Sequence, residues 1–441
     1  MNSQACRAVL LAINAKYTHS SLAVWLIAGG VAKYARLPHD VKVVEGTINE
    51  PMETVAGRVI EHAPDVVGIS TYIWNAGMLP ELLALLRQRL PGVIIVLGGP
   101  EASHNAGYWL AHGADHVLCG EGERSFAALL DGVACPCDND YIDPYTDEYF
   151  AALNGRMAYL ETSRGCPFHC AFCLSGGTGV RFFPLETVKK QIDRLSISGT
   201  KTIKLVDRTF NCNPERAYEI FEYVINLDTP CRFHFEVAAD LFDARTLALL
   251  ATAPPGRIQM EAGLQSFFKP ALSAVCRQTD LDKAEASIRT IIKGGNIHMH
   301  VDLIAGLPYE TLPAIMDSFD RAYALGAHNL QLGFLKLLHG TPLRQQAKVL
   351  GIIYKKEPPY EIISSPWLSQ DDIQALKQTE NALQRTHNKG RFLPLLERAI
   401  PASKLRPFEF FHALGKAAPN HGLSLEVYTR QVNDFVQSLL N

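Results

Sequence analysis

The sequence lacks several features that would assign it to a particular class of protein. It has no run of lysine or arginine, and its formal net charge is only −3, so charge gives no reason to expect a nucleic-acid partner. Its most apolar stretch, SLAVWLIAGGVA, is about a dozen residues long, too short to cross a bilayer. The start, MNSQACRAVLLAIN, lacks the charged segment and cleavage site of a signal peptide. We therefore expect a cytoplasmic protein without a membrane or nucleic-acid partner.

Cysteine is present, but not in the dense, even pattern of a small secreted domain. Ten cysteines are spread unevenly over 441 residues. Three of them gather at Cys166, Cys170 and Cys173, within SRGCPFHCAFCLSGG. This distribution indicates a reducing compartment and a metal-binding role for the clustered three. Cys135 and Cys137 form a C-x-C pair without further ligands nearby, and we interpret them as spare thiols.

The first part of the chain, residues 1–131, alternates strand-like and helix-like segments. The apolar runs RAVLLAIN, VKVVEG, DVVGISTY, VIIVLGG and DHVLCGEGE are separated by stretches with helical periodicity. This pattern predicts five βα units and a doubly wound parallel sheet of the α/β class. Ligands of such sheets bind at the carboxyl ends of the strands, which here carry residues 14–20, 70–72, 98–103 and 120–123.

The rest of the chain divides into three further segments. Residues 132–157 are polar and contain proline, and we interpret them as a linker. Residues 158–345 hold six strand candidates: YLETS, TIKLVD, RFHFEVA, RIQMEAGL, HMHVDLIAG and NLQLGFLK. Six βα units predict a partial (β/α)6 barrel with its chemistry at the strand carboxyl ends. Residues 346–441 have helical periodicity, with Ser369 and Ser424 as candidate helix caps. We expect them to pack over the barrel mouth.

The spacing C-x3-C-x2-C restricts the metal that the three cysteines can hold. Thiolates suit zinc or iron–sulfur clusters. A structural zinc site needs four closed ligands, and the sequence offers no second C-x2-C or H-x3-5-H nearby. Three thiolates can bind three irons of a [4Fe–4S] cluster and leave the fourth iron free for a substrate. Phe168 and Phe172 are placed to shield such a cluster from water.

The cysteine motif, with an aromatic residue just before the third cysteine, resembles that of the radical S-adenosylmethionine (SAM) enzymes. The resemblance implies that the fourth iron chelates the amino and carboxylate groups of SAM. It further implies that an electron from the reduced cluster cleaves the sulfonium to a 5′-deoxyadenosyl radical, which abstracts hydrogen from a small-molecule substrate. Such an enzyme needs an electron donor such as ferredoxin or flavodoxin.

Two further stretches, GLQSFFKPALSAVCRQ and VDLIAGLPYET, resemble the subgroup that includes the anaerobic coproporphyrinogen oxidases. That resemblance places Gln265 and Asp302 at the ribose hydroxyls of SAM. It places Arg277 at the methionine carboxylate, for which a guanidinium is suited, and Glu236 at the amino group. Asp207 is the fifth expected SAM contact: it ends the second strand, where the family often has a Gly-Gly-Glu run that this sequence lacks.

A doubly wound domain before a radical SAM barrel resembles the cobalamin-binding radical SAM proteins. The segments VVGIS, VLGGPEAS and LCGEGE carry this likeness, because glycine allows close approach to a ligand and hydroxyls can bond a corrinoid tail. The resemblance implies cobalamin contacts at Ser70, Thr71, Gly98, Gly99, Gly120, Glu121 and Gly122. The motif Asp-x-His-x-x-Gly, which supplies a cobalt ligand in part of the family, is absent. His19 is the nearby imidazole, and we expect a capping or tail contact there.

The function implied by these resemblances is methyl transfer from methylcobalamin to an unactivated carbon, with SAM as radical source and methyl donor. A radical cyclase or rearrangement enzyme without methyl transfer is an alternative within the same family. A corrinoid-binding sensor that no longer turns over is an alternative of a different class. A methylthiotransferase is disfavoured, because its N-terminal domain would need three cluster cysteines and this one has Cys6 and Cys119.

Overall fold

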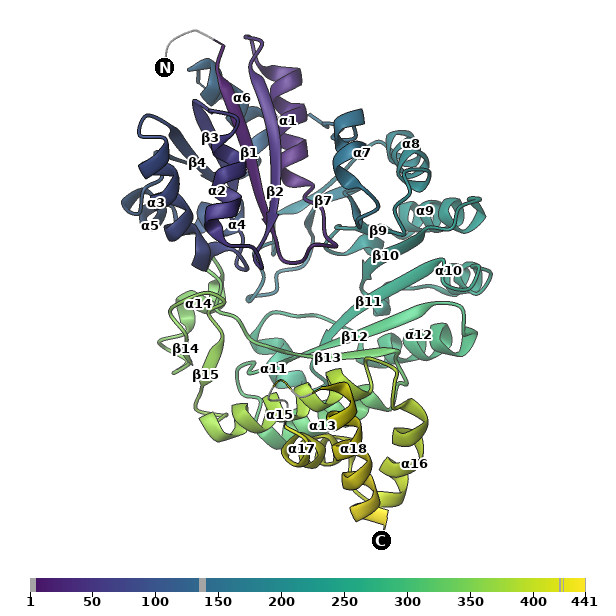
Figure 1. The fold of residues 1–441 in the computed structure, drawn as a ribbon. Helices are drawn as coiled ribbons and strands as arrows, with labels where there is room; N and C mark the ends of the chain where they lie inside the picture. The colour runs from purple at the N-terminus through teal and green to yellow at the C-terminus, as the bar shows by residue number, and fades with distance from the viewer. Residues whose placement is uncertain (1–4, 135–139, 420–421, 423, 441) are drawn as a thin grey trace.

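The computed structural model describes residues 5–134, 140–419, 422 and 424–440. Two parallel β-sheets, each flanked by helices, follow one another along the chain, and a group of helices forms the C-terminal part (Figure 1). This arrangement confirms the predicted α/β fold class with a helical C-terminal region. The pair Cys135 and Cys137 lies outside the described residues. No helix among the residues that the structure describes is long and apolar enough to span a membrane.

The N-terminal sheet is doubly wound. Its strands are β1 (Arg7–Asn14), β2 (Asp40–Thr47), β3 (Val66–Ser70), β4 (Ile94–Gly98) and β5 (His116–Leu118), all parallel and in the order β2-β1-β3-β4-β5. The order reverses between β1 and β3, so the carboxyl ends of these two strands border the crevice where such sheets bind ligands.

The continuous apolar run of β1 is explained by helices on both faces of this sheet. Ala8, Leu10 and Ala12 share a core with α1 (Ala23–Tyr34) and α6 (Gly122–Asp131). The alternate residues of β1 belong to a second core with α2 (Met52–Ile60) and α3 (Leu79–Arg89). Because both faces of β1 are buried, its sequence shows no polar alternation. The remaining helices of this domain are the short α4 (Pro100–His104) and α5 (Ala106–Ala111).

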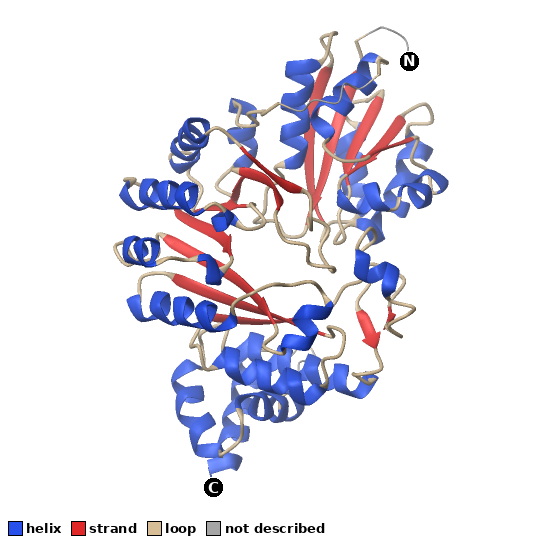
Figure 2. Cartoon of the chain, turned by 180° about the vertical axis from the view of Figure 1, so that it is seen from behind, coloured by secondary structure: helices blue, strands red, loops and turns tan. Residues whose placement is uncertain are grey.

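The second sheet forms the partial barrel. Its six parallel strands are β6 (Ala158–Leu160), β9 (Thr202–Leu205), β10 (Arg232–Val237), β11 (Ile258–Gln265), β12 (His298–Ala305) and β13 (Asn329–Phe334), paired in chain order. The helices α8 (Leu185–Ser196), α9 (Pro214–Asn226), α10 (Ala244–Leu250), α12 (Leu281–Gly294) and α13 (Leu312–Tyr323) lie along one side of this sheet (Figure 2). Ile258, Met260 and Ala262 of β11 are buried in the core. The alternate residues of the same strand are partly exposed on the inner face, which is therefore available to polar side chains.

The first strand of the barrel is shorter than predicted. The segment YLETS was expected as one strand, but β6 ends at Leu160, and the chain then enters β7 (Ser163–Cys166). β7 pairs in antiparallel fashion with β8 (Gly179–Phe182), so the cysteine motif forms the connection within a small hairpin. A Cβ atom on Gly165, whose φ is +103°, would lie 1.9 Å from the carbonyl oxygen of Gly179. This close approach requires glycine at position 165.

The segment predicted as a linker contains a helix, α7 (Asp147–Leu153). Thr146 caps the helix by accepting a hydrogen bond from the backbone N–H of Tyr149, and Tyr149 and Leu153 are buried. Because the surrounding residues have a low apolar content, the helix and its two buried side chains were not predicted. The segment interpreted as a linker therefore includes a helix that is anchored by buried side chains.

The C-terminal helices cover an edge of the barrel instead of its mouth. They are α15 (Gln370–Thr386), α16 (Leu393–Ser403), α17 (Pro407–Ala417) and α18 (Leu425–Leu440), and α15 packs on β13 while α17 packs on α13 (Figure 1). Ser369 forms a capping box with Asp372, and Ser424 accepts a hydrogen bond from the N–H of Val427. Covering β13 protects the backbone of an edge strand, which explains this position.

A separate segment connects the barrel to the N-terminal domain before these helices begin. It contains α14 (Pro342–Gln346), β14 (Ile353–Tyr354) and β15 (Ile362–Ser364). The hydroxyl of Tyr360 donates to the buried carboxylate of Glu101, which lies in α4 directly after β4, over 2.5 Å. The two sheets are therefore linked through this segment as well as through the chain between them.

Candidate cofactor sites

The three clustered cysteines lie at and just beyond the end of β7. Cys166 and Cys170 are buried, and Cys173 is partly exposed. The turn is held by a hydrogen bond from the N–H of Cys173 to the carbonyl of Cys170 (3.0 Å), and Ala171 donates to the carbonyl of Val275 (2.9 Å). The latter bond ties the cysteine loop, residues 166–173, to the segment after β11. The loop is thus held by a bond within its own turn and by a bond to the barrel.

Hydrogen-bond donors surround the sulfur atoms. Nη1 of Arg277 donates to Sγ of Cys170 over 3.5 Å, and the N–H of Ser175 donates to Sγ of Cys173 over 3.4 Å. Burial raises the pKa of the Cys170 thiol, and the Arg277 guanidinium opposes that shift. Donors directed at sulfur fit thiolates that hold an iron–sulfur cluster.

The cysteine loop does not form a site for a single ion. Among the described residues, no group of three or more His, Cys, Asp or Glu side chains is arranged to hold one metal ion. The three thiolates of a [4Fe–4S] cluster bind three different iron atoms, so they need not converge on one point. The buried, donor-rich loop therefore fits a cluster better than it fits zinc.

A polar cleft with a cavity volume of about 150 Å³ opens beside this loop. It lies at the carboxyl ends of β10, β11 and β12, and four of the five side chains predicted to contact SAM line it: Glu236, Gln265, Arg277 and Asp302. Phe168 of the cysteine loop also lines the cleft. Segments as far apart in the sequence as Phe168 and Asp302 are thus brought to the rim of one cleft.

The backbone around Gln265 and the side chain of Arg277 are adapted to this cleft. The register between β11 and β12 shifts between Gly263 and Gln265, and Gln265 adopts a positive φ of 69°. Arg277 donates through Nη2 to the carbonyl of Gly263, while its buried Nε has no hydrogen-bond partner among the described atoms. A buried guanidinium N–H without a partner in a cleft favours binding of an anionic group such as a carboxylate.

The acids of the cleft interact with groups that sequence reasoning missed. Nζ of Lys204 lies 3.0 Å from Oε1 of Glu236 and 3.5 Å from Oε2 of Glu261. Burial and the neighbouring Glu261 carboxylate raise the pKa of Asp302 well above its usual range. Both Lys204 and Glu261 occupy alternate positions in predicted strands, and the strand period could have placed them on the inner face. Arg208, Thr209, Asp240, Gln278 and Thr279 also line the cleft and were not predicted.

The structure does not bring Asp207 into the cleft. Its carboxylate is buried and accepts hydrogen bonds from the N–H and hydroxyl of Thr162 (3.1 and 2.7 Å) and from the hydroxyl of Ser163 (2.5 Å). It therefore holds the start of the cysteine hairpin against the end of β9. The position at a strand end was predicted, but the direction of the side chain was not.

Four of the residues expected to contact cobalamin form a tight corner at the carboxyl edge of the N-terminal sheet. Ser70 and Gly98 end β3 and β4 in register with one another. The N–H of the buried Thr71 donates to the carbonyl of Gly98 over 2.7 Å. Gly99 has φ +97°, and a Cβ atom there would lie 2.7 Å from the carbonyl oxygen of Thr71. Only glycine permits this approach.

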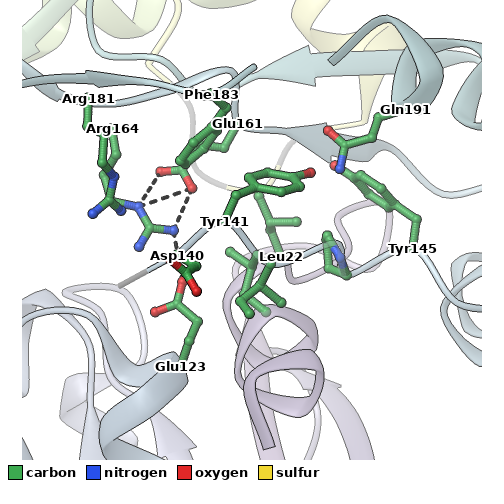
Figure 3. A pocket seen from close by; sticks show the side chains of 13 residues that line it. Leu22, Glu123, Asp140, Tyr141, Tyr145, Glu161, Arg164, Arg181, Phe183 and Gln191 are labelled. Atoms are coloured by element: carbon green, nitrogen blue, oxygen red, sulfur yellow. Dashed lines mark hydrogen bonds and ion pairs between the residues drawn. The ribbon is translucent and has the colours of Figure 1, made fainter. Parts of the chain in front are cut away.

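The loop after β5 holds the other three residues expected to contact cobalamin, Gly120, Glu121 and Gly122. Part of this loop contacts the barrel. Gly120 has φ +79°, and a Cβ atom there would meet nothing within 4 Å. Glu121 forms ion pairs with Arg164 (2.9 Å) and Arg181 (2.8 Å) of the cysteine hairpin. Gly122 begins α6 and packs close to Ile27. Figure 3 shows the Arg164 guanidinium near Glu161 and Glu123, the latter from the first turn of α6.

His19 contacts the barrel. Its Nδ1 lies 2.6 Å from the hydroxyl of Tyr159 in β6, and burial lowers the pKa of this imidazole. The contact joins the segment after β1 to the first barrel strand. The sequence did not predict this contact.

Comparison with known proteins agrees with this geometry. Residues 8–130 match the family model of the B12 binding domain, and residues 160–322 match that of the radical SAM superfamily. Residues 348–428 match a model described as a protein of unknown function (DUF4080). The chain is therefore a radical SAM protein with an N-terminal B12-binding domain, as its motifs predicted.

Curated relatives and solved structures of the same kind are similar over most of the chain. The 2-(S-pantetheinyl)-carbapenam-3-carboxylate methyltransferase of Streptantibioticus cattleyicolor is 24% identical over 82% of this chain and 60% of its own length. The cobalamin-dependent radical SAM methyltransferase TokK of Streptomyces tokunonensis is 25% identical over 76% of this chain and 56% of its own length. This chain thus spans less than two thirds of either relative. The radical SAM methyltransferase TsrM from Kitasatospora setae, with cobalamin and a [4Fe–4S] cluster bound, shares the fold with a TM-score of 0.67 at 16% identity, covering 99% of both chains.

Proposed function

We propose that this protein is a cobalamin-dependent radical SAM enzyme that transfers a methyl group to an unactivated carbon of a small molecule. The observation that carries the proposal is the position of the cysteine loop. It borders a polar cleft whose Arg277 has an unpartnered Nε, in a chain that also has a B12-binding domain. The methyltransferases TokK and TsrM, which are similar to this chain, support the same reaction class.

In this proposal, Cys166, Cys170 and Cys173 hold a [4Fe–4S] cluster, and SAM occupies the adjacent cleft. Together these cofactors supply a 5′-deoxyadenosyl radical once the cluster is reduced by a donor such as ferredoxin or flavodoxin. Arg277 binds the methionine carboxylate, and Glu236 binds the amino group.

Gln265 and Asp302 bind the ribose hydroxyls of SAM. Burial and the Glu261 carboxylate raise the pKa of Asp302, which favours the protonated carboxyl group, a form that can donate as well as accept a hydrogen bond.

The carboxyl edge of the N-terminal sheet is the proposed cobalamin site, and the cofactor supplies the transferable methyl group. Thr71, Gly98 and Gly99 form its rigid corner. Ser70 and the open backbone at Gly120 provide further contacts. Glu121 and Gly122 act indirectly in this proposal, because one is ion-paired to the cysteine hairpin and the other packs on α1. We further propose a cytoplasmic location, where reducing conditions preserve the cluster thiolates.

The test is a cleavage assay under anaerobic conditions. The purified chain is reconstituted with iron and sulfide, supplied with cobalamin and dithionite, and incubated with SAM, and the products are followed by mass spectrometry. 5′-Deoxyadenosine together with S-adenosylhomocysteine and bound corrinoid is the expected result. 5′-Deoxyadenosine alone would support radical chemistry without methyl transfer, such as a cyclase. A complete cluster without either product would contradict the proposal and favour a corrinoid-binding sensor.

A further inference from the structure

A row of charged side chains crosses the inner face of the barrel at the cleft. Lys204 lies on β9, Glu236 on β10, Glu261 on β11 and Asp302 on β12, so four neighbouring strands contribute one member each. Glu236 and Glu261 are paired across their strands, and Gly263, two residues after Glu261, is the partner of Asp302. The three acids line the cleft, whereas Lys204 approaches them from the β9 side.

Lys204 is the cation that joins two of these acids. Its Nζ is 3.0 Å from Glu236 and 3.5 Å from Glu261, and its side chain is 25% exposed. Glu261 receives a second contact from Nε2 of His234 over 3.1 Å. Burial opposes the charge of Lys204, but the two carboxylates outweigh it and raise its pKa. Lys204 therefore stays charged although three quarters of its side chain is covered.

Other titratable groups also face Lys204, and His19 of the segment after β1 is one of them. Tyr159 comes from β6, His234 from β10 and His300 from β12. Burial raises the pKa of Tyr159, and it lowers that of His300 to about 4, so both are neutral near pH 7. Burial and the Glu261 carboxylate raise the pKa of Asp302. In this row, Lys204 contacts both Glu236 and Glu261 and supplies one positive charge to two carboxylates.

We propose that Lys204 is a positioning residue for SAM: it fixes Glu236 and Glu261 as carboxylates at the wall of the cleft, so that Glu236 can accept a hydrogen bond from the amino group of the ligand. The inference rests on the proposed function, since it requires SAM in this cleft. Lys204 itself does not line the cleft and acts through the two acids.

Loss of the lysine has a defined electrostatic consequence. Two neighbouring carboxylates in a partly buried wall would repel each other without a cation, and their pKa values would rise. One of them would then take up a proton as the pH falls, and Glu236 would become a weaker acceptor for the amino group of SAM. SAM binding should therefore become pH-dependent in a way that simple loosening of the fold would not produce.

The experiment compares the binding of SAM to the reconstituted wild-type protein and to Lys204→Met by anaerobic calorimetry. Between about pH 6 and about pH 7.5, the wild-type Kd should change little. The Kd of Lys204→Met should be about tenfold higher near pH 6, with the difference shrinking as the pH rises. Lys204→Arg should restore the wild-type profile. Lys201→Met, an exposed lysine just before β9, is the matched control and should behave as wild type.

The outcomes separate this inference from the function on which it rests. If the wild type binds no SAM and forms no 5′-deoxyadenosine, the proposed function fails. If the wild type does both but Lys204→Met has the wild-type Kd and pH profile, the role of Lys204 is refuted. Should Lys204→Met lose its iron on purification, Lys204→Gln fills the same space with a neutral polar group and carries the same expectation.

Discussion

Arg164 of the cysteine hairpin donates to Glu123 of the N-terminal domain through Nη2 over 2.9 Å. The same guanidinium reaches Glu121 and Glu161 over 2.9 and 2.7 Å. Arg164 lies two residues before Cys166, and Glu123 lies in the first turn of α6 (Figure 3). One side chain therefore connects the approach to the proposed cluster with the loop expected to contact cobalamin. A further ion pair, between Glu45 of β2 and Arg156 just before β6, is 3.0 Å long and also largely buried.

Replacing Arg164 by methionine should destabilise the chain by about 3 kcal/mol, because partly buried carboxylates would lose their shared cation. Urea unfolding of the protein without cofactors measures this change. Arg430→Met removes an exposed i,i+4 pair with Glu426 and should cost no more than about 0.5 kcal/mol. Equal effects of the two substitutions would show that Arg164 contributes no more than a surface pair.

Cys170→Ala should abolish the iron–sulfur cluster and leave the fold intact, because alanine lacks a ligand but fits the space of the buried thiol. Iron content and visible absorption after reconstitution measure the cluster, and far-UV circular dichroism measures the fold. Cys119→Ser, at an exposed cysteine outside the loop, should keep the full iron content. A Cys170→Ala protein with wild-type iron content would show that the ligand assignment is wrong.

Gly99→Ala should destabilise the N-terminal domain by roughly 2 kcal/mol, since its φ is +97° and the new Cβ would lie 2.7 Å from the carbonyl oxygen of Thr71. It should also weaken corrinoid binding, measured by absorption titration with cobalamin. Gly107→Ala, in α5, meets nothing within 4 Å and should be neutral or stabilising by up to about 1 kcal/mol. A Gly99→Ala protein as stable as Gly107→Ala would refute the strained corner.

Because of Glu310, the free energy of unfolding of the wild-type protein should fall as the pH rises. Burial raises its pKa to about 7, against an ordinary value of 4.5, and hydrogen bonds from Ser266 and Ser318 do not offset this. A folded-state pKa above the unfolded one means that its stabilising contribution is complete below about pH 4.5 and is lost as the pH rises through about 7.

Glu310→Gln cannot ionise, so its free energy of unfolding should gain on that of the wild type by up to roughly 3 kcal/mol between about pH 5 and about pH 8. Urea unfolding at several pH values checks this. Glu426→Gln, at an exposed site, should follow the wild type at every pH. A pH-independent difference between wild type and Glu310→Gln would contradict the raised pKa.

Much of the fold could be predicted from the sequence because the relevant signals are local. The run RAVLLAIN is apolar at every position, and the structure buries both faces of β1 under helices. The alternating pattern of RIQMEAGL matches β11, with one face in the core. The end of β6 was misplaced, because the turn toward the hairpin depends on the bonds from Thr162 and Ser163 to Asp207. Asp207 lies more than forty residues away.

The site was predicted less completely for a similar reason. Resemblance to known motifs identified Glu236, Gln265, Arg277 and Asp302, and the structure brings all four to one cleft. It did not identify Lys204, whose importance depends on which residues of β10 and β11 lie beside it. Glu121 was expected at a corrinoid, but docking of the two sheets pairs it with Arg164 and Arg181.

The sequence by itself determined the order of strands and helices, the spacing of the three cysteines and the glycines that close turns require. These features depend on neighbours within a few residues, where the spacing of side chains is set by the period of the backbone. Only the tertiary structure decided that Asp207 bonds the start of the cysteine hairpin instead of lining the cleft. It also decided that Lys204 joins two acids and that Arg164 connects the two cofactor regions. Burial and charge pairing depend on distances between segments far apart in the chain, and those distances exist only after the sheets have packed.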